Sequence, residues 1–125
     1  MAKKIFGVVA GLVAWVIIVS IAGPIMRAAW PAYASVADAM TFTLPMMMAR
    51  LSIGAVATVA AGWVAGMIAG RSTIATVLPG VLLLVAFIPE HISLWEKFPV
   101  WYHLTFLLSL IPLTFAGGKM ARARS

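Results

Sequence analysis

The segment from Pro45 to Gly70 constrains the fold most, because it is a continuous apolar run with a single charged residue, Arg50. At ~1.5 Å per helical residue, it can cross a hydrocarbon core of roughly 30 Å. In lipid, small residues spaced four apart let neighbouring helices approach closely. The sequence therefore predicts a membrane-spanning helix with one flank suited to helix packing. The small residues of that flank are Gly54, Thr58, Gly62, Gly66 and Gly70.

The rest of the chain has the same apolar character. Hydrophobic residues make up 64% of the sequence and charged residues 10%, and the mean hydropathy is +1.10, whereas soluble domains are about half apolar. Cysteine is absent, which excludes disulfides and thiolate metal ligands. We expect an all-α integral membrane four-helix bundle that forms a single domain over residues 1–125. Its helices are predicted at about 5–23, 45–70, 72–88 and 99–117.

The net charge of +6 follows the predicted topology. Most of the basic residues lie at the two chain ends and between the second and third apolar runs, whereas the charges near the other two connections cancel. The positive-inside rule then predicts that both termini face the cytoplasm. We expect a multi-pass protein of the bacterial inner membrane that contacts the lipid bilayer and does not bind nucleic acid. The cytoplasmic basic residues would be Lys3, Lys4, Arg71, Lys119, Arg122 and Arg124.

The two connections on the other side contain the aromatic residues typical of the membrane interface. In the first, residues 24–44, Pro31 favours the first turn of a short helix over 32–40 that would lie on the outer surface. The second, residues 89–98, contains the most polar segment of the chain. The predicted interfacial aromatics are Trp30, Tyr33, Phe42, Trp95, Phe98, Trp101 and Tyr102.

Further small residues and prolines suggest how the helices pack. Gly7 and Gly11 would place the cytoplasmic half of the first helix against the glycines of the second helix. Pro79 and Gly80 interrupt the third apolar run and predict a bend there. That bend can serve as a packing kink or as a functional hinge. Gly117 is predicted to end the last helix before the basic tail.

One group of polar residues could bind a solute or an ion. Histidine and carboxylate side chains both suit zinc, but their spacing here matches no metal motif, so neither a metal nor a cofactor is predicted. Alternatively, the acids stabilise helix N-termini and the histidines hydrogen-bond at the headgroups. Arg50 is expected to pair with Glu90 or Asp38, because an unpaired arginine in a membrane helix is costly. The candidate outer polar residues are Arg50, Glu90, His91, Glu96 and His103.

These patterns lead to several hypotheses about function. No nucleophile motif or phosphate-binding loop is present, so no catalytic residue is predicted and we do not expect an enzyme. The first hypothesis is a protein that acts through helix packing, as a homo-oligomer or as an accessory subunit of a membrane complex. Alternatively, the small-residue flank packs against the first and third helices within the monomer.

The second hypothesis is a transporter or channel for a small or apolar solute, with Glu90 and His91 as an outer gate or proton acceptor and Pro79-Gly80 as a hinge. The third is a membrane enzyme or metal site that uses the outer polar residues.

Overall fold

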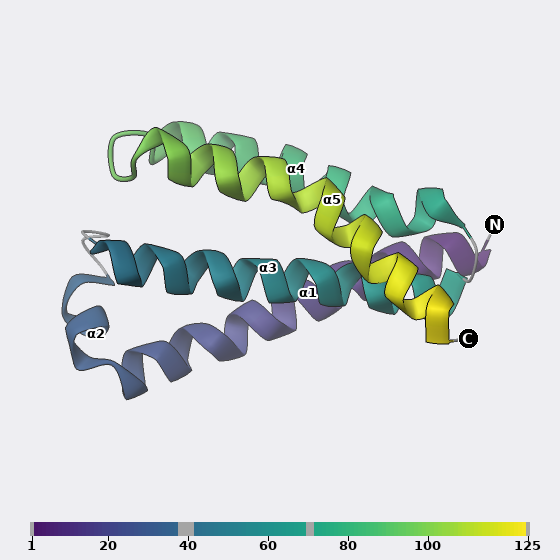
Figure 1. Ribbon diagram of the computed structural model, residues 1–125, viewed down its shortest axis with the longest axis horizontal. Helices are drawn as coiled ribbons and strands as arrows, with labels where there is room; N and C mark the ends of the chain where they lie inside the picture. Colours follow the sequence, from purple (N-terminus) through teal and green to yellow (C-terminus); the bar gives the residue numbers. More distant parts are fainter. Residues whose placement is uncertain (1, 38–41, 70–71, 125) are drawn as a thin grey trace.

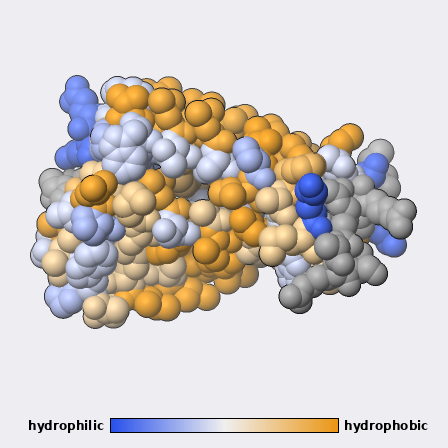
Figure 2. All heavy atoms as spheres, viewed as in Figure 1, coloured by the Kyte–Doolittle hydropathy of each residue, from blue (hydrophilic) through white to orange (hydrophobic). Residues whose placement is uncertain are grey.

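The computed structural model describes residues 2–37, 42–69 and 72–124. It is all-helical, as predicted, with the elements α1 (Ala2–Ala29), α2 (Pro31–Ala37), α3 (Leu44–Ala69), α4 (Thr73–Ser93) and α5 (Val100–Arg124). Within these described residues, 4 helices are long and apolar enough to cross a membrane: α1, α3, α4 and the part of α5 from Val100 to Ala121. Figure 2 shows hydrophobic side chains over the middle of the molecule and more hydrophilic ones towards both ends. This distribution suits a multi-pass membrane protein.

The bundle has two distinct ends (Figure 1). The N-terminus of α1 and the C-terminus of α5 lie at one end, which we call the terminal end. The helix α2 and the turn at 94–99 lie at the other, which we call the loop end. The helix α3 contacts α1, α4 and α5 and is thus the central element. The other three long helices therefore all pack against α3.

The small residues of α3 are buried within the single chain. Ala57, Ala61 and Ala65 have no exposed surface. A Cβ atom added at Gly62 would lie 1.9 Å from the carbonyl oxygen of Thr114 in α5. On the other side, the backbone of α1 approaches so closely that a Cβ at Gly11 would lie 2.6 Å from the Ala61 carbonyl oxygen. The flank is thus occupied from two sides, by α1 and α5.

The remaining predicted packing residues share this arrangement, except for Gly70, which lies outside the described residues. Gly7 faces Ala65, and Gly66 faces Gly118 and Ala121 of α5. Gly54 and Thr58 are also buried, on the half of α3 nearer the loop end. The sequence suggested the third helix as the second neighbour of the flank, but most of this contact comes from the last helix.

Three helices run past the ends expected from the sequence. The helix α1 continues through Pro24 to Ala29, and α4 continues through Pro89 to Ser93. A proline removes one backbone hydrogen bond, which a membrane helix tolerates when side chains or neighbouring helices satisfy the freed carbonyl group. The extension of α4 has a functional consequence, because it places Glu90 and His91 in the last turns of a helix rather than in a connection.

The helix α5 passes through Gly117 and Gly118 instead of ending there. A Cβ atom at Gly117 would lie 2.1 Å from the carbonyl oxygen of Val59 in α3. At Gly118 it would lie 2.5 Å from the side chain of Thr76 in α4. These glycines therefore let α5 cross two helices at close range, and they do not act as a helix stop.

The predicted bend and short helix both fall on structured elements. Pro79 and Gly80 are buried inside α4, and a Cβ at Gly80 would lie 2.5 Å from the Thr114 hydroxyl oxygen. This position is a contact with α5, and its use as a hinge stays a prediction.

The short helix of the first connection is α2, whose described residues end at Ala37. At the start of α4, the Ser72 hydroxyl accepts a hydrogen bond from the Ala75 N–H group at 3.2 Å.

Candidate functional site

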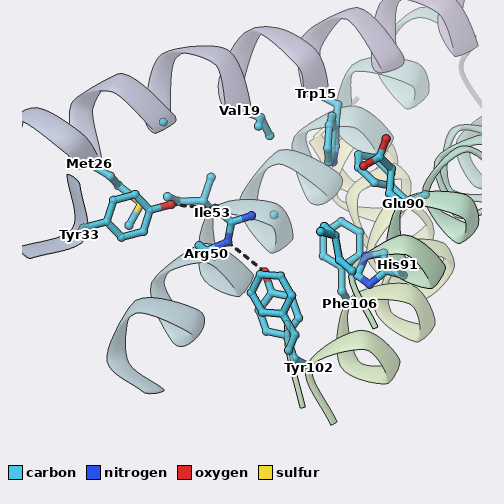
Figure 3. Close-up of a pocket in the computed structure, with 15 residues that line it drawn as sticks. Trp15, Val19, Met26, Tyr33, Arg50, Ile53, Glu90, His91, Tyr102 and Phe106 are labelled. Carbon is cyan, nitrogen blue, oxygen red and sulfur yellow. Dashed lines mark hydrogen bonds between the residues drawn. The ribbon is translucent and has the colours of Figure 1, made fainter. Parts of the chain in front are cut away.

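A cavity of about 300 Å³ lies among the helices in the half of the bundle nearer the loop end. This volume is at the lower limit of small-molecule sites, which span roughly 300–1,000 Å³. Its wall is mostly aliphatic and aromatic, with few polar groups (Figure 3). The polar side chains in the wall belong to Tyr33, Arg50, Glu90, His91 and Tyr102.

The cavity begins where the close helix packing ends. Trp15 is buried, and its indole N–H donates a hydrogen bond of 3.1 Å to the Thr58 hydroxyl. The Thr58 hydroxyl in turn donates to the Gly54 carbonyl at 2.6 Å. The Trp15 ring lies 5.2 Å from the Phe87 ring, centroid to centroid, so large side chains replace glycine and alanine between the helices here. Towards the terminal end the helices touch, whereas towards the loop end they enclose space.

Arg50 is held in an aromatic cage on one wall of the cavity. Its Nε atom donates a hydrogen bond of 3.2 Å to the Tyr102 hydroxyl, and its Nη1 atom donates one of 2.8 Å to the Tyr33 hydroxyl (Figure 3). The guanidinium carbon lies 4.6 Å from the centroid of the Phe42 ring and 5.9 Å from that of Phe98. Aromatic faces stabilise a cation by ~0.5–2 kcal/mol each. Tyr33, Phe42, Phe98 and Tyr102 thus offset the cost of an arginine in an apolar helix.

The predicted ion pair between Arg50 and Glu90 is wrong. Glu90 lies across the cavity and is exposed, and the tyrosine hydroxyls accept the hydrogen bonds of Arg50 instead. The other expected partner, Asp38, lies outside the described residues. The tyrosine hydroxyls accept these two hydrogen bonds without neutralising the guanidinium, and no carboxylate of the described residues pairs with Arg50.

The third nitrogen of the guanidinium, Nη2, has no hydrogen-bond partner within the described parts of the chain. Across those residues, no fully buried side-chain nitrogen or oxygen lacks a partner, so Nη2 retains accessible surface. Since Arg50 lines the cavity, that surface opens into it. A ligand in the cavity can therefore accept hydrogen bonds from Arg50 without breaking the two that it makes with tyrosine.

The two histidines form a second polar pair in the wall. The Nδ1 atoms of His91 and His103 are 2.6 Å apart, and His103 Nε2 lies 3.2 Å from the Trp95 carbonyl oxygen. His103 has no exposed surface. Its ring stacks on that of Trp95, with the two ring centroids 4.7 Å apart and an angle of 10° between the ring planes. His91 lines the cavity and separates it from His103.

The structure brings most of the predicted polar residues together, but not all of them. Arg50, Glu90 and His91 share the cavity, and His103 supports His91 from behind. Glu96 is exposed on the turn at 94–99 and does not line the cavity. In the described part of the chain, no group of 3 or more histidine, cysteine, aspartate or glutamate residues is placed to hold a metal ion.

Sequence reasoning missed the tyrosines. It assigned Tyr33 and Tyr102 to the membrane interface, but both are buried and bind Arg50. A signal was available, because an arginine within an apolar span needs hydrogen-bond acceptors. The chain contains no asparagine or glutamine, and Tyr33 and Tyr102 are its only 2 tyrosines. Two of the aromatic residues that the sequence pattern places at the membrane interface therefore belong to the site.

Comparison of the chain with protein-family models, with curated proteins and with solved structures gives no match. The functional argument therefore rests on the cavity and its wall.

Proposed function

We propose that this protein is a membrane-embedded binding protein for a small amphipathic anion, which it takes into the cavity beside Arg50. One observation supports this proposal above all others. A charged guanidinium with an unused nitrogen, Nη2, opens into an otherwise largely apolar cavity. A charged side chain within a membrane-spanning helix is energetically costly, and such residues mark functional sites in membrane proteins.

The wall indicates the chemistry of the ligand. Aliphatic and aromatic residues favour an apolar body, for which burial contributes about 25 cal/mol per Å². The planar guanidinium fork favours a carboxylate or phosphate head, and its hydrogen bonds are strengthened by the low dielectric of the site. Glu90 carries a negative charge at the same cavity, so it opposes a second anionic group. The ligand class that satisfies all three conditions is a monoanionic amphiphile.

The charge pattern of the sequence orients the site in this proposal. With both termini in the cytoplasm of a bacterium, the loop end and its cavity face the outer side of the inner membrane. The short helix α2 then lies at the outer interface and contributes Tyr33 to the site. The ligand reaches Arg50 from the outer side, because the glycine contacts close the bundle towards the terminal end.

Transfer of the ligand across the membrane would need those contacts to open. Pro79-Gly80 is the place in α4 where such a movement would occur, as expected for a transporter. An assembly role through the small-residue flank has less support, since α1 and α5 cover that flank within one chain. Native mass spectrometry separates the two roles, because an assembly role requires a wild-type oligomer or a co-purifying membrane protein.

Filling the cavity tests the proposal. Gly23 lines the cavity, and a Cβ atom added there would meet nothing within 4 Å. We expect Gly23→Phe to fold normally and to weaken octanoate binding at least tenfold, measured by titration calorimetry in lipid nanodiscs against empty nanodiscs. Ile21→Phe is the matched control, because Ile21 is an exposed apolar residue of the same helix outside the cavity. Equal octanoate binding by both variants would place the ligand elsewhere.

Removing the other charge of the cavity has the opposite effect. Glu90 is exposed but lines the site, so its carboxylate repels an anionic ligand. We expect Glu90→Gln to strengthen octanoate binding several-fold, in keeping with a partly screened charge pair of ~1 kcal/mol or less. Binding of the neutral analogue octanol should not change. Weaker octanoate binding in this variant would mean that Glu90 supports binding, directly or through a neighbouring group, and would contradict a site in which Glu90 only repels the anion.

A further inference from the structure

We propose that His91 and His103 together form a site for one proton in the cavity wall, and that this site becomes charged when the anion binds. The ligand would thus be taken up together with a proton. The coupling rests on the proposed anion site, whereas the proton site rests on the geometry of the imidazole pair alone.

The hydrogen bonds determine the tautomers of the neutral pair. A carbonyl oxygen only accepts, so His103 Nε2, 3.2 Å from the Trp95 carbonyl, carries a hydrogen. Neutral His103 then has a lone pair on Nδ1. Because the two Nδ1 atoms are 2.6 Å apart, His91 must donate from Nδ1 to that lone pair. Neutral His91 is therefore left with its lone pair on Nε2.

The Nε2 atom of His91 is the place where a proton can add. It forms no hydrogen bond within the described residues, yet none of their fully buried side-chain nitrogens lacks a partner, so it has accessible surface. Since His91 lines the cavity, a proton from water can reach this lone pair there. Protonation of Nε2 breaks no existing bond, because His91 still donates from Nδ1 to His103.

The pair accepts one proton only. Once His91 is an imidazolium, the last lone pair of the two rings is the one on His103 Nδ1, which already accepts the hydrogen of His91. A second proton would set two N–H groups against each other at 2.6 Å, in a place where His103 has no exposed surface. The Trp95 ring stacks on His103, and the centroid of the Phe106 ring lies 5.0 Å from that of His91. Both aromatic rings favour a single positive charge on the pair.

The charged groups around His91 couple its protonation to the anion. From α3, Arg50 opposes a second positive charge in the cavity, while Glu90 of the same helix as His91 favours it. Tyr102 and His103 face His91 from α5, Tyr33 reaches the cavity from α2, and no α1 residue in the wall is ionisable. An anion bound to Arg50 offsets the opposing charge. By linkage, protonation must then strengthen anion binding by the same factor.

The proton site is tested without ligand by nitrogen-15 NMR of histidine-labelled protein between pH 8 and pH 5. We expect His103 to keep its hydrogen on Nε2, and His91 to gain one on Nε2 while its Nδ1 stays protonated. The matched variant is His91→Gln, whose amide N–H can still donate to His103 but which has no second imidazole nitrogen to take up a proton; the signals of a protonated His91 should then be absent. Two independently titrating imidazoles, or protonation of His103 Nδ1 in the folded protein, would overturn the assignment.

The coupling is tested by octanoate titration calorimetry in two buffers of different ionisation enthalpy, at a pH where NMR shows the apo pair neutral. We expect a net uptake of up to one proton per octanoate in the wild type and none in His91→Gln. Affinity should rise by up to about tenfold per pH unit towards lower pH. Octanoate binding without proton uptake would overturn the coupling and leave the anion site intact. Loss of octanoate binding altogether would refute the anion site and the coupling, while the NMR titration would still decide the proton site.

Discussion

Replacement of Gly62 by leucine is expected to prevent the bundle from assembling. A Cβ atom at this position would lie 1.9 Å from the Thr114 carbonyl oxygen and 2.6 Å from its carbon, and neither is the end of a flexible side chain. To make room, α5 would have to move away from α3. Overpacking of a close-packed interior costs ~1–3 kcal/mol, and a clash with backbone should exceed that range. We expect loss of a folded species in size-exclusion chromatography and loss of the cooperative thermal transition.

The control for Gly62→Leu is the same change at Gly23. Nothing lies within 4 Å of a Cβ at Gly23, so Gly23→Leu should keep a wild-type thermal transition. The comparison separates backbone contact from the general effect of a larger residue in a membrane helix. A folded Gly62→Leu monomer would show that α3 and α5 do not touch at this position. If the wild type were an oligomer that Gly62→Leu dissociated into stable monomers, the flank would serve assembly between chains.

Replacement of Arg50 by glutamine is expected to weaken octanoate binding by at least about 30-fold, the equivalent of ~2 kcal/mol lost when a charged partner of a buried pair is removed. The same change removes a charge from an apolar helix, which lowers the cost of inserting that helix. We therefore expect the variant to be as stable as the wild type or more stable. Titration calorimetry and thermal unfolding in the same nanodiscs measure the two effects.

Arg50→Lys distinguishes charge from geometry. Lysine keeps the positive charge but cannot reproduce the planar fork that reaches Tyr33, Tyr102 and the ligand together. We expect octanoate affinity between those of the wild type and Arg50→Gln. The affinity for octanol should change by no more than about twofold in both variants. The altered shape of the wall is expected to change the free energy of octanol binding by about half a kcal/mol or less. Equal losses for octanoate and octanol would indicate that Arg50 only maintains the shape of the cavity.

The architecture could be predicted from the sequence because it depends on local patterns. The apolar runs predict four long helices, and the four-residue spacing from Gly54 to Gly66 predicts a closely packed flank on the second of them. In the structure, Gly62 and its neighbours on α3 are buried. Helix ends were predicted less well. Pro24, Pro89 and Gly117 look like stops in isolation, but α1, α4 and α5 continue through them, and at Gly117 the reason is the close contact with Val59 of α3.

The candidate site was only partly predictable, because it depends on contacts between distant segments. Arg50, Glu90 and His91 are conspicuous as ionisable residues beside apolar runs. Their grouping around one cavity depends on how α4 extends past Pro89 and where Trp15 ends the close packing. The pairing of His91 with His103 joins residues on two helices, and no spacing rule indicates it. The aromatic cage around Arg50 includes Tyr33 of α2, which is 17 residues away from Arg50 in the sequence.

Photoaffinity labelling tests the central claim most directly. A diazirine analogue of octanoate, activated by light in nanodiscs and mapped by mass spectrometry, should label residues of the cavity wall such as Trp15, Met26 and Phe106. Excess octanoate should suppress this labelling, octanol should do so only at a much higher concentration, and Gly23→Phe should abolish it. Labelling confined to exposed side chains such as Ile21 and Leu108, unchanged by octanoate or by the filled cavity, would contradict the account.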